Sequence, residues 1–469
     1  MKRSFVKVLA MYLLFSTCFA CTPNIDNLMD AGTPIIESSP ALIAEVKATT
    51  HFLGWGNVGD TTISVKTDKD VLPALTGKKI NLAPITSNLE GGFRMISVGG
   101  SLSAGFRDGG LYREGQLTAF PNLIARQMNI SFYQPLFEAN EGNGSGYKTL
   151  VETEPIATFK MVTNNLGYTD SKAEKLKNFT GSNLDHYAFP HAKRNFAPII
   201  SDYGNYSGQK FSDRIFTNSN RTNYQYNWNL LKSQSCDFFI FETGWDQIIS
   251  DIMIGNGGGI NPLNPVEETP ELQLIQSLVD NKGKGVLLNV PDMLDFPYFN
   301  QFTEKKIIKA GLKLKVQVSS SSTNYRDFNF KTDKIIPTAK TEKLFTGQLK
   351  DVVELSDFDV LSNEGGDMEW LANIPKPYNE FMIQRKAKAT NLPVVDMYGL
   401  YKKIIAGAYI TDDGVKVDAN WAKGNFFSTD GIYPTAFGQA VIANEVIKTM
   451  NQFYKLSIPL VDTRFFLKK

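Results

Sequence analysis

The stretch that decides the fold is MISVGGSLSAG, residues 95–105. Its first four residues form a short apolar strand pattern, which ends at the paired glycines Gly99 and Gly100. Ser101 follows directly, in the kind of turn that carries a nucleophile at the end of a buried strand. A serine hydroxyl reacts only when a neighbouring base takes its proton, so the groups expected around Ser101 decide its role.

Strand-like and helix-like segments alternate outward from this turn. Further short apolar runs, typical of buried strands, cover residues 236–241, 285–290 and 392–397, whereas helical spacing of apolar residues covers 117–128, 270–280 and 436–453. Such alternation predicts an α/β domain with a central parallel sheet covered by helices on both faces.

Composition and charge exclude several classes of protein. With 469 residues, 42% of them hydrophobic and 21% charged, the chain is ordinary globular material that can bury a large core. Its 49 basic and 48 acidic residues leave a net charge of +1, which gives no field to gather nucleic acid. We therefore expect no nucleic-acid partner, and no motif indicates a cofactor.

The first 20 residues have the pattern of an export signal. Lys2 and Arg3 precede a mostly apolar run, and small residues lead to Ala20 and Cys21. Cys21 resembles the lipidated cysteine of bacterial lipoproteins, with Cys18 as a second candidate, and ordinary cleavage or a retained signal helix remain alternatives. Several acyl chains at Cys21 would hold the protein firmly to a membrane. Cys236 would then be the remaining cysteine, and it opens a strand pattern that predicts buried packing.

Four blocks of residues, in order along the chain, resemble the SGNH (GDSL) hydrolase superfamily. They are the 99–105 turn with Ser101, residues 206–208 with Gly208, residues 242–247 with Asp246, and residues 430–434 with Asp430 and Tyr433. Longer strings at 108–112, 289–292 and 427–431 resemble a narrower group of outer-membrane lipoproteins from Gram-negative bacteria. This resemblance implies a flavodoxin-like three-layer α/β/α sandwich with a central parallel sheet, the SGNH hydrolase fold, carrying large insertions.

The resemblance also assigns roles to these positions, and three of them depart from the pattern. Ser101 stands at the nucleophile, Gly208 at an oxyanion donor, and Asp430 at the acid of the last block. Asp246, however, replaces an asparagine that donates to the oxyanion, and an ionised carboxylate offers only acceptors. Tyr433 replaces the histidine base, and a phenol with a pKa of about 10 is a poor base at neutral pH.

Gly100 is the third departure, because it replaces the aspartate that precedes the serine in the family. Another histidine could still serve as the base, and the chain has only His51, His186 and His191. We expect His186 and His191 to lie in a surface loop of an insertion, although a loop folded over Ser101 is the alternative. A metal site is rejected, because this pair lacks an evident third ligand.

The domain organisation follows from these segments. Residues 1–20 are predicted as the signal and 21–90 as a tether with a small N-terminal addition. The SGNH-like domain spans 91–457, with insertions at about 106–200 and 316–380, and 458–469 form a tail.

Two functions of different classes are compatible with this sequence. The first is a noncatalytic lipoprotein, anchored in the outer membrane of a Gram-negative bacterium on either its periplasmic or its outer face. It would act as an accessory subunit of a β-barrel complex, with a barrel protein or other lipoproteins as partners. The second is a serine esterase or lipase that uses Ser101 with a base from the insertions.

Overall fold

A five-stranded, all-parallel sheet forms the centre of the protein. Its strands are β1 (Met95–Gly99), β4 (His186–Ala188), β5 (Phe238–Glu242), β6 (Lys284–Leu288) and β12 (Val394–Val395), in the spatial order β12-β6-β5-β1-β4. Numbered along the chain, this is the 2-1-3-4-5 order of flavodoxin-like sheets. β1 and β5 are almost completely buried, as expected for strands covered on both faces.

The computed structural model describes residues 71–467 except 76, 78, 88–91, 139–143, 163–175, 195, 199–207, 217–224, 254–268, 320, 337, 339, 350, 363–370 and 422. The predicted signal, Cys21 and most of the predicted tether therefore lie outside the described residues. Within the described part of the chain, no helix is both long and apolar enough to cross a membrane.

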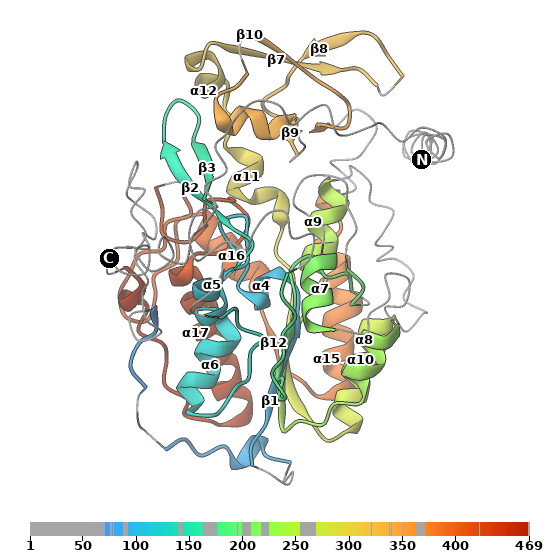
Figure 1. Ribbon diagram of the computed structural model, residues 1–469, viewed down its shortest axis with the longest axis vertical. Helices are drawn as coiled ribbons and strands as arrows, with labels where there is room; N and C mark the ends of the chain where they lie inside the picture. The colour runs from blue at the N-terminus through green and yellow to red at the C-terminus, as the bar shows by residue number, and fades with distance from the viewer. Residues whose placement is uncertain are drawn as a thin grey trace.

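Helices cover both faces of the sheet, as Figure 1 shows with the sheet seen nearly edge-on. One layer contains α5 (Arg113–Leu117), α6 (Phe120–Met128), α16 (Met397–Ile405) and α17 (Ala436–Tyr454). The other contains α7 (Gln209–Ile215), α8 (Gln225–Lys232), α9 (Trp245–Met253), α10 (Pro270–Asp280) and α15 (Arg385–Thr390). The predicted mixed α/β class, with a parallel sheet between helices, is thus confirmed in this coarse form.

The helix ends follow ordinary capping chemistry. In α17, the Thr435 hydroxyl accepts a hydrogen bond from the N–H of Gly438, and Lys455 ends the helix in the left-handed conformation. In α16, the carboxylate of Asp396 accepts from the N–H of Gly399. The helices predicted at 270–280 and 436–453 correspond to α10 and α17: Pro270 stands at the start of α10, and the Thr435 cap stands at the start of α17.

The first predicted insertion contains parts of the central sandwich. Residues 106–200 include the crossover helix α6 and the edge strand β4, which pairs with β1 through Ser97 and His186. They also include a hairpin of β2 (Tyr147–Glu152) and β3 (Thr158–Val162). This part of the chain therefore completes the sheet and adds a hairpin beside it.

Two small sheets lie beyond one end of the sandwich (Figure 1). β10 (Asp351–Leu355), β7 (Leu312–Gln317) and β8 (Tyr325–Asp327) form a three-stranded sheet, and β9 (Lys334–Ile335) pairs with β11 (Val360–Leu361). Helix α12 (Glu304–Lys309) precedes β7. We call residues 304–361 the satellite lobe; it extends along the long axis of the molecule.

The described residues also include short helical segments that complete the connections. They are η3 (Ala83–Ile85), α4 (Ser101–Ala104), η5 (Met293–Asp295), α11 (Pro297–Asn300), η6 (Thr341–Thr346), α14 (Pro375–Pro377), the π-helical η7 (Tyr378–Gln384) and η8 (Thr463–Leu467). η8 lies in the predicted C-terminal tail, which is held to α17 by hydrogen bonds between Asn444 and Val461. Cys236 is buried as predicted, and burial raises the pKa of its thiol to about 12.

Candidate functional site

Ser101 and Asp246 are brought together by two neighbouring strands. β1 and β5 run parallel, with Val98 beside Phe241, so the chain leaves both strands at the same edge of the sheet. Ser101 then begins α4, and Asp246 lies in the first turn of α9. This edge, between the first and third strands of a 2-1-3-4-5 sheet, is the switch point where such folds commonly bind ligands.

The Ser101 hydroxyl is enclosed and fully engaged. Its Oγ donates to Oδ2 of Asp246 at 3.0 Å and accepts the backbone N–H of His191 at 3.0 Å. The side chain is 0% exposed. In this arrangement the oxygen that would attack a substrate is neither accessible from solvent nor free of hydrogen bonds.

Asp246 accepts hydrogen bonds on both carboxylate oxygens. Oδ2 accepts the backbone N–H groups of Ser101 (2.8 Å) and Ala192 (3.1 Å) as well as the Ser101 hydroxyl. Oδ1 accepts the Tyr433 hydroxyl at 2.7 Å. Burial raises the pKa of Asp246, and these donors oppose that shift. Four donors around one carboxylate are the partners that its ionised form requires.

Gly100 leaves the space that the Asp246 carboxylate occupies. A Cβ atom at Gly100 would lie 2.5 Å from Oδ2 of Asp246, closer than real Cβ contacts allow. A side chain at position 100 and the observed carboxylate therefore exclude each other. Two of the three departures noted in the sequence, Gly100 and Asp246, are thus one linked feature of the structure.

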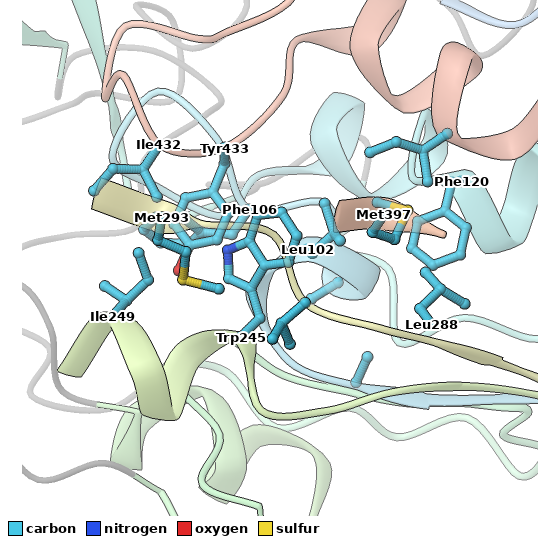
Figure 2. Packing of buried hydrophobic residues seen from close by; sticks show 14 of the residues in the cluster. Leu102, Phe106, Phe120, Trp245, Ile249, Leu288, Met293, Met397, Ile432 and Tyr433 are labelled. Atoms are coloured by element: carbon cyan, nitrogen blue, oxygen red, sulfur yellow. The ribbon is translucent and has the colours of Figure 1, made fainter. Parts of the chain in front are cut away.

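Tyr433 is part of this cluster through its hydroxyl. The Tyr433 hydroxyl donates to Asp246, and the Tyr433 ring packs edge-on against Phe106 with the ring centroids 5.4 Å apart. The residue is 1% exposed. Figure 2 shows Tyr433 and Phe106 among the apolar side chains of Trp245 and Met293. The position expected to hold a base therefore supplies a buried donor to a carboxylate.

Asp430 acts on the loop backbone. Its Oδ1 accepts the N–H groups of Ile432 (2.9 Å) and Tyr433 (2.8 Å), and its Oδ2 accepts that of Gly109 (3.3 Å). Burial raises the pKa of Asp430 to about 6. This carboxylate holds the turn that presents Tyr433, and it accepts hydrogen bonds from backbone N–H groups rather than from a base.

His186 and His191 were expected in a surface loop, and this expectation is wrong. His186 and His191 are each 2% exposed, because residues 186–188 add a strand to the sheet and carry the following turn over Ser101. The His186 ring bonds to the backbone of Ser103, and the His191 ring meets Phe106 edge-on at 4.9 Å. Burial lowers the pKa of each imidazole to about 3. Within the described residues, no group of three potential ligands could hold a metal ion.

Gly208 packs against the same turn from the start of α7. A Cβ atom there would lie 2.5 Å from the carbonyl oxygen of His191. Glycine at this position therefore permits the close approach that seats the His191 and Ala192 N–H groups over Ser101 and Asp246. Tyr206 and Ser207, the other members of that sequence block, lie outside the described residues.

Glu242 is a second buried carboxylate beneath the serine turn, and its sequence position alone did not single it out. Its Oε2 accepts the Gly100 N–H and the Ser103 hydroxyl, both at 3.0 Å. Burial and the nearby charge of Asp246 raise the pKa of Glu242 to about 7. Its position at the end of β5, four residues before Asp246, is the sequence feature that could have indicated that it belongs to the site.

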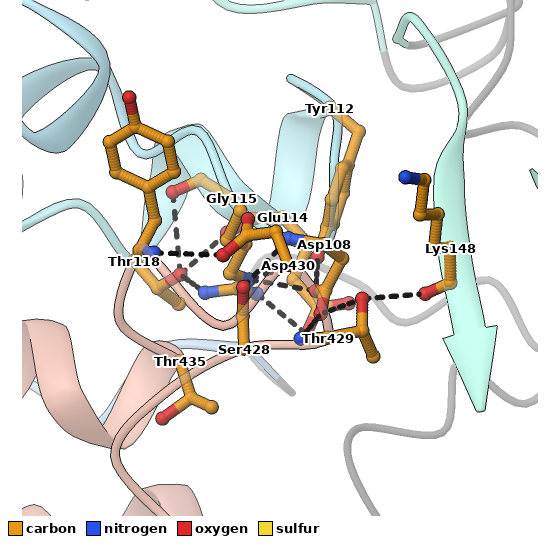
Figure 3. A network of polar contacts seen from close by, with 12 residues as sticks. Asp108, Tyr112, Glu114, Gly115, Thr118, Lys148, Ser428, Thr429, Asp430 and Thr435 are labelled. Atoms are coloured by element: carbon orange, nitrogen blue, oxygen red, sulfur yellow. Dashed lines mark hydrogen bonds and ion pairs between the residues drawn. The ribbon is translucent and has the colours of Figure 1, made fainter. Parts of the chain in front are cut away.

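A second polar network joins two of the longer sequence strings (Figure 3). Oδ1 of Asp108 accepts the N–H (3.0 Å) and hydroxyl (3.1 Å) of Thr429, and Oδ2 accepts the Tyr112 hydroxyl at 2.8 Å. Arg107 donates to the Tyr112 oxygen at 2.9 Å. These hydrogen bonds join residues 108–112 to residues 427–431 beside the Asp430 turn.

Comparison with protein-family models, with curated proteins and with solved structures finds no match for the chain. The class defined by the described residues is a mixed α/β protein whose central parallel sheet is flanked by helices, an arrangement compatible with a three-layer α/β/α fold. The resemblance to SGNH hydrolases rests on the sequence blocks.

Proposed function

We propose that this protein is a noncatalytic lipoprotein with an SGNH-type fold that serves as an accessory subunit of an outer-membrane β-barrel complex. The observation that carries the first part is the state of Ser101. Its hydroxyl is 0% exposed and donates to a carboxylate that already accepts three other hydrogen bonds. A nucleophile needs access to substrate and a base whose pKa suits the working pH.

Tyr433 and the two histidines near Ser101 do not supply a matched base, and the N–H of Ser101 is not available to an oxyanion. The Tyr433 hydroxyl donates a hydrogen bond to Asp246, and the histidine rings have pKa values of about 3, which makes them weak bases. The backbone N–H of Ser101, a natural oxyanion donor, is already bound by Asp246. These features favour a structural role for the site.

The satellite lobe supports the accessory role. Three of its large apolar side chains are solvent-exposed: Ile308 on α12 (67%), Val352 on β10 (51%) and Tyr325 on β8 (39%). Contiguous exposed apolar side chains commonly mark a binding surface, and the accessory role proposed here takes these three side chains as part of one. A barrel protein held beside the lipid anchor at Cys21 is the partner proposed for this surface.

Labelling with a fluorophosphonate tests the absence of catalysis. We expect the purified protein to remain unlabelled under conditions that label an active serine esterase stoichiometrically. Ser101→Ala should then be indistinguishable from the wild type. Stoichiometric labelling that disappears in Ser101→Ala would overturn the noncatalytic proposal.

The esterase alternative retains one supporting observation. Oδ2 of Asp246 lies 3.0 Å from Oγ of Ser101, and burial raises the pKa of this carboxyl, so in this alternative Asp246 is the group that accepts the serine proton. Such a mechanism requires the loop around Ala192 to open. Labelling of Ser101 that is lost in Asp246→Asn would favour this alternative.

Purification of the anchored protein from outer membranes tests the partner. We expect a β-barrel protein to copurify in constant stoichiometry, and its yield to fall in Ile308→Asp and Val352→Asp. Ile410→Asp is the matched control, because Ile410 is 64% exposed and lies outside the satellite lobe. Equal barrel recovery with all three variants would reject the lobe as the contact surface.

A further inference from the structure

The donors around Asp246 form a compact carboxylate-binding site. Four groups converge on one carboxylate: the N–H of Ser101, the N–H of Ala192, the Ser101 hydroxyl and the Tyr433 hydroxyl. They belong to three residues from separate segments of the chain, Ser101, Ala192 and Tyr433. Asp246 itself comes from α9, next to Gly244, whose φ of +87° is a left-handed conformation suited to glycine.

We propose that this is a latent anion site whose permanent occupant is the protein's own Asp246, and that removal of this side chain lets a small free carboxylate take its place. This inference rests on the proposed noncatalytic role, because it explains what the enclosed donors do instead of chemistry. The ligand class is a monovalent carboxylate of the size of formate or acetate.

The donor set is suited to such a ligand. Two backbone N–H groups and one hydroxyl meet a single oxygen at 2.8–3.1 Å, and a second hydroxyl meets the other oxygen at 2.7 Å. Buried donors that lose their acceptor are destabilising, so a vacated site favours any anion that restores those bonds. Small ligands can enter buried cavities left by side-chain removal, as engineered cavities show.

Space at the site is also matched to a carboxylate. The Asp246 carboxylate fills the direction in which a Cβ of Gly100 would point, and the Tyr433 ring packs edge-on against Phe106. Asp246→Gly would remove the carboxylate together with its Cβ and would leave every donor in place. Acetate or formate can then present the same two oxygens.

Thermal unfolding of Asp246→Gly in sodium formate or sodium acetate, against sodium chloride at equal ionic strength, tests the inference. We expect the Tm of this variant to rise by at least about 2 °C more in formate or acetate than in chloride, with a saturable concentration dependence. The wild type and Asp246→Asn should show no such difference, because their side chains fill the site.

Glu271→Gly is the matched control for general salt effects. It also removes a buried carboxylate, but Glu271 accepts hydrogen bonds from the side chains of Tyr378 and Arg194, whereas Asp246 also accepts them from backbone N–H groups. An equal formate response in Glu271→Gly, or no specific response in Asp246→Gly, would overturn the inference. If Asp246→Gly does not fold, Asp246→Ala with formate, the smaller ligand, provides the same test.

The outcome is separable from that of the proposed function. Fluorophosphonate labelling of wild-type Ser101 would reject the noncatalytic role, whereas formate uptake concerns only the variant that lacks the carboxylate. A wild type that stays unlabelled, together with an Asp246→Gly variant that ignores formate, would reject the anion site alone.

Discussion

Two buried carboxylates on adjacent helices in the chain, Asp246 in α9 and Glu271 in α10, have opposite surroundings. Asp246 is 3% exposed and accepts four hydrogen bonds of 2.7–3.1 Å, two of them from backbone N–H groups. Glu271 is 1% exposed and has two longer contacts of 3.4 Å, both on Oε1, while its Oε2 has no hydrogen-bond partner within the described residues.

The difference separates a carboxylate that organises its surroundings from one that is merely enclosed. A buried charge is stabilised only when its oxygens are satisfied, and otherwise the group tends to bind a proton. Burial raises the pKa of Glu271 to about 7, with the nearby Arg194 opposing that shift. Asp246 therefore joins four segments of the chain, and Glu271 is expected to be exchangeable for a neutral side chain.

Replacement of Asp246 by alanine should have the largest effect. Asp246→Ala leaves two backbone N–H groups and the hydroxyls of Ser101 and Tyr433 without their acceptor in a buried site. We expect the free energy of unfolding to fall by about 3–5 kcal/mol, the range for disrupting a buried charged network. Denaturant titration measures this loss, and a decrease below about 1 kcal/mol would contradict the organising role.

Gly100→Ala should rank second. Its added Cβ would lie 2.5 Å from Oδ2 of Asp246, and φ at Gly100 is −106°, so the expected cost comes from the clash and not from a left-handed backbone. We expect a loss of about 2–3 kcal/mol. In the background of Asp246→Gly the same substitution should cost at least about 1 kcal/mol less, which a double-mutant cycle detects. Additive losses would show that the two positions are not coupled.

The main strands and helices could be predicted because apolar periodicity and glycine turns are local signals. Residues 95–98, 270–280 and 436–453 match β1, α10 and α17 closely. The run at 392–397 was less well predicted, because β12 covers only Val394–Val395 and α16 already begins at Met397. Asp396 decides this boundary, since its carboxylate caps the helix.

The site was only partly predictable for a different reason. Ser101, Asp246, Asp430 and Tyr433 were selected by residue type and order, and they do converge. The contacts from His191 and Ala192 were missed because both donate through backbone N–H groups, which any residue other than proline possesses. The burial of His186 was missed because its three-residue strand is too short to give a periodic signal.

Tyr433→Phe should have a smaller effect than either substitution above. It removes one hydrogen bond to Oδ1 of Asp246 and keeps the ring against Phe106. Hydrogen bonds to charged groups contribute about 1.5–3 kcal/mol, and we expect a loss of about 1.5–2 kcal/mol. In the background of Asp246→Ala this loss should shrink markedly. An unchanged loss in that background would show that the hydroxyl stabilises the protein through another contact.

Glu271→Gln should give the smallest change, and one of opposite sign. Because the folded-state pKa of Glu271 is raised to about 7, its contribution to stability is fully present below its unfolded pKa of about 4.3 and is lost as the pH rises through 7. A neutral glutamine avoids this loss, although it gives up the attraction to Arg194. We therefore expect Glu271→Gln to be about 1 kcal/mol more stable than the wild type at pH 8 and no more stable at pH 4.5.

Denaturant titrations at the two pH values measure this difference, with Gln276→Glu, on the same helix but away from that pair, as a control for surface charge. Destabilisation at pH 8 would mean that the ion pair with Arg194 outweighs burial, and that Glu271 organises its surroundings as Asp246 does.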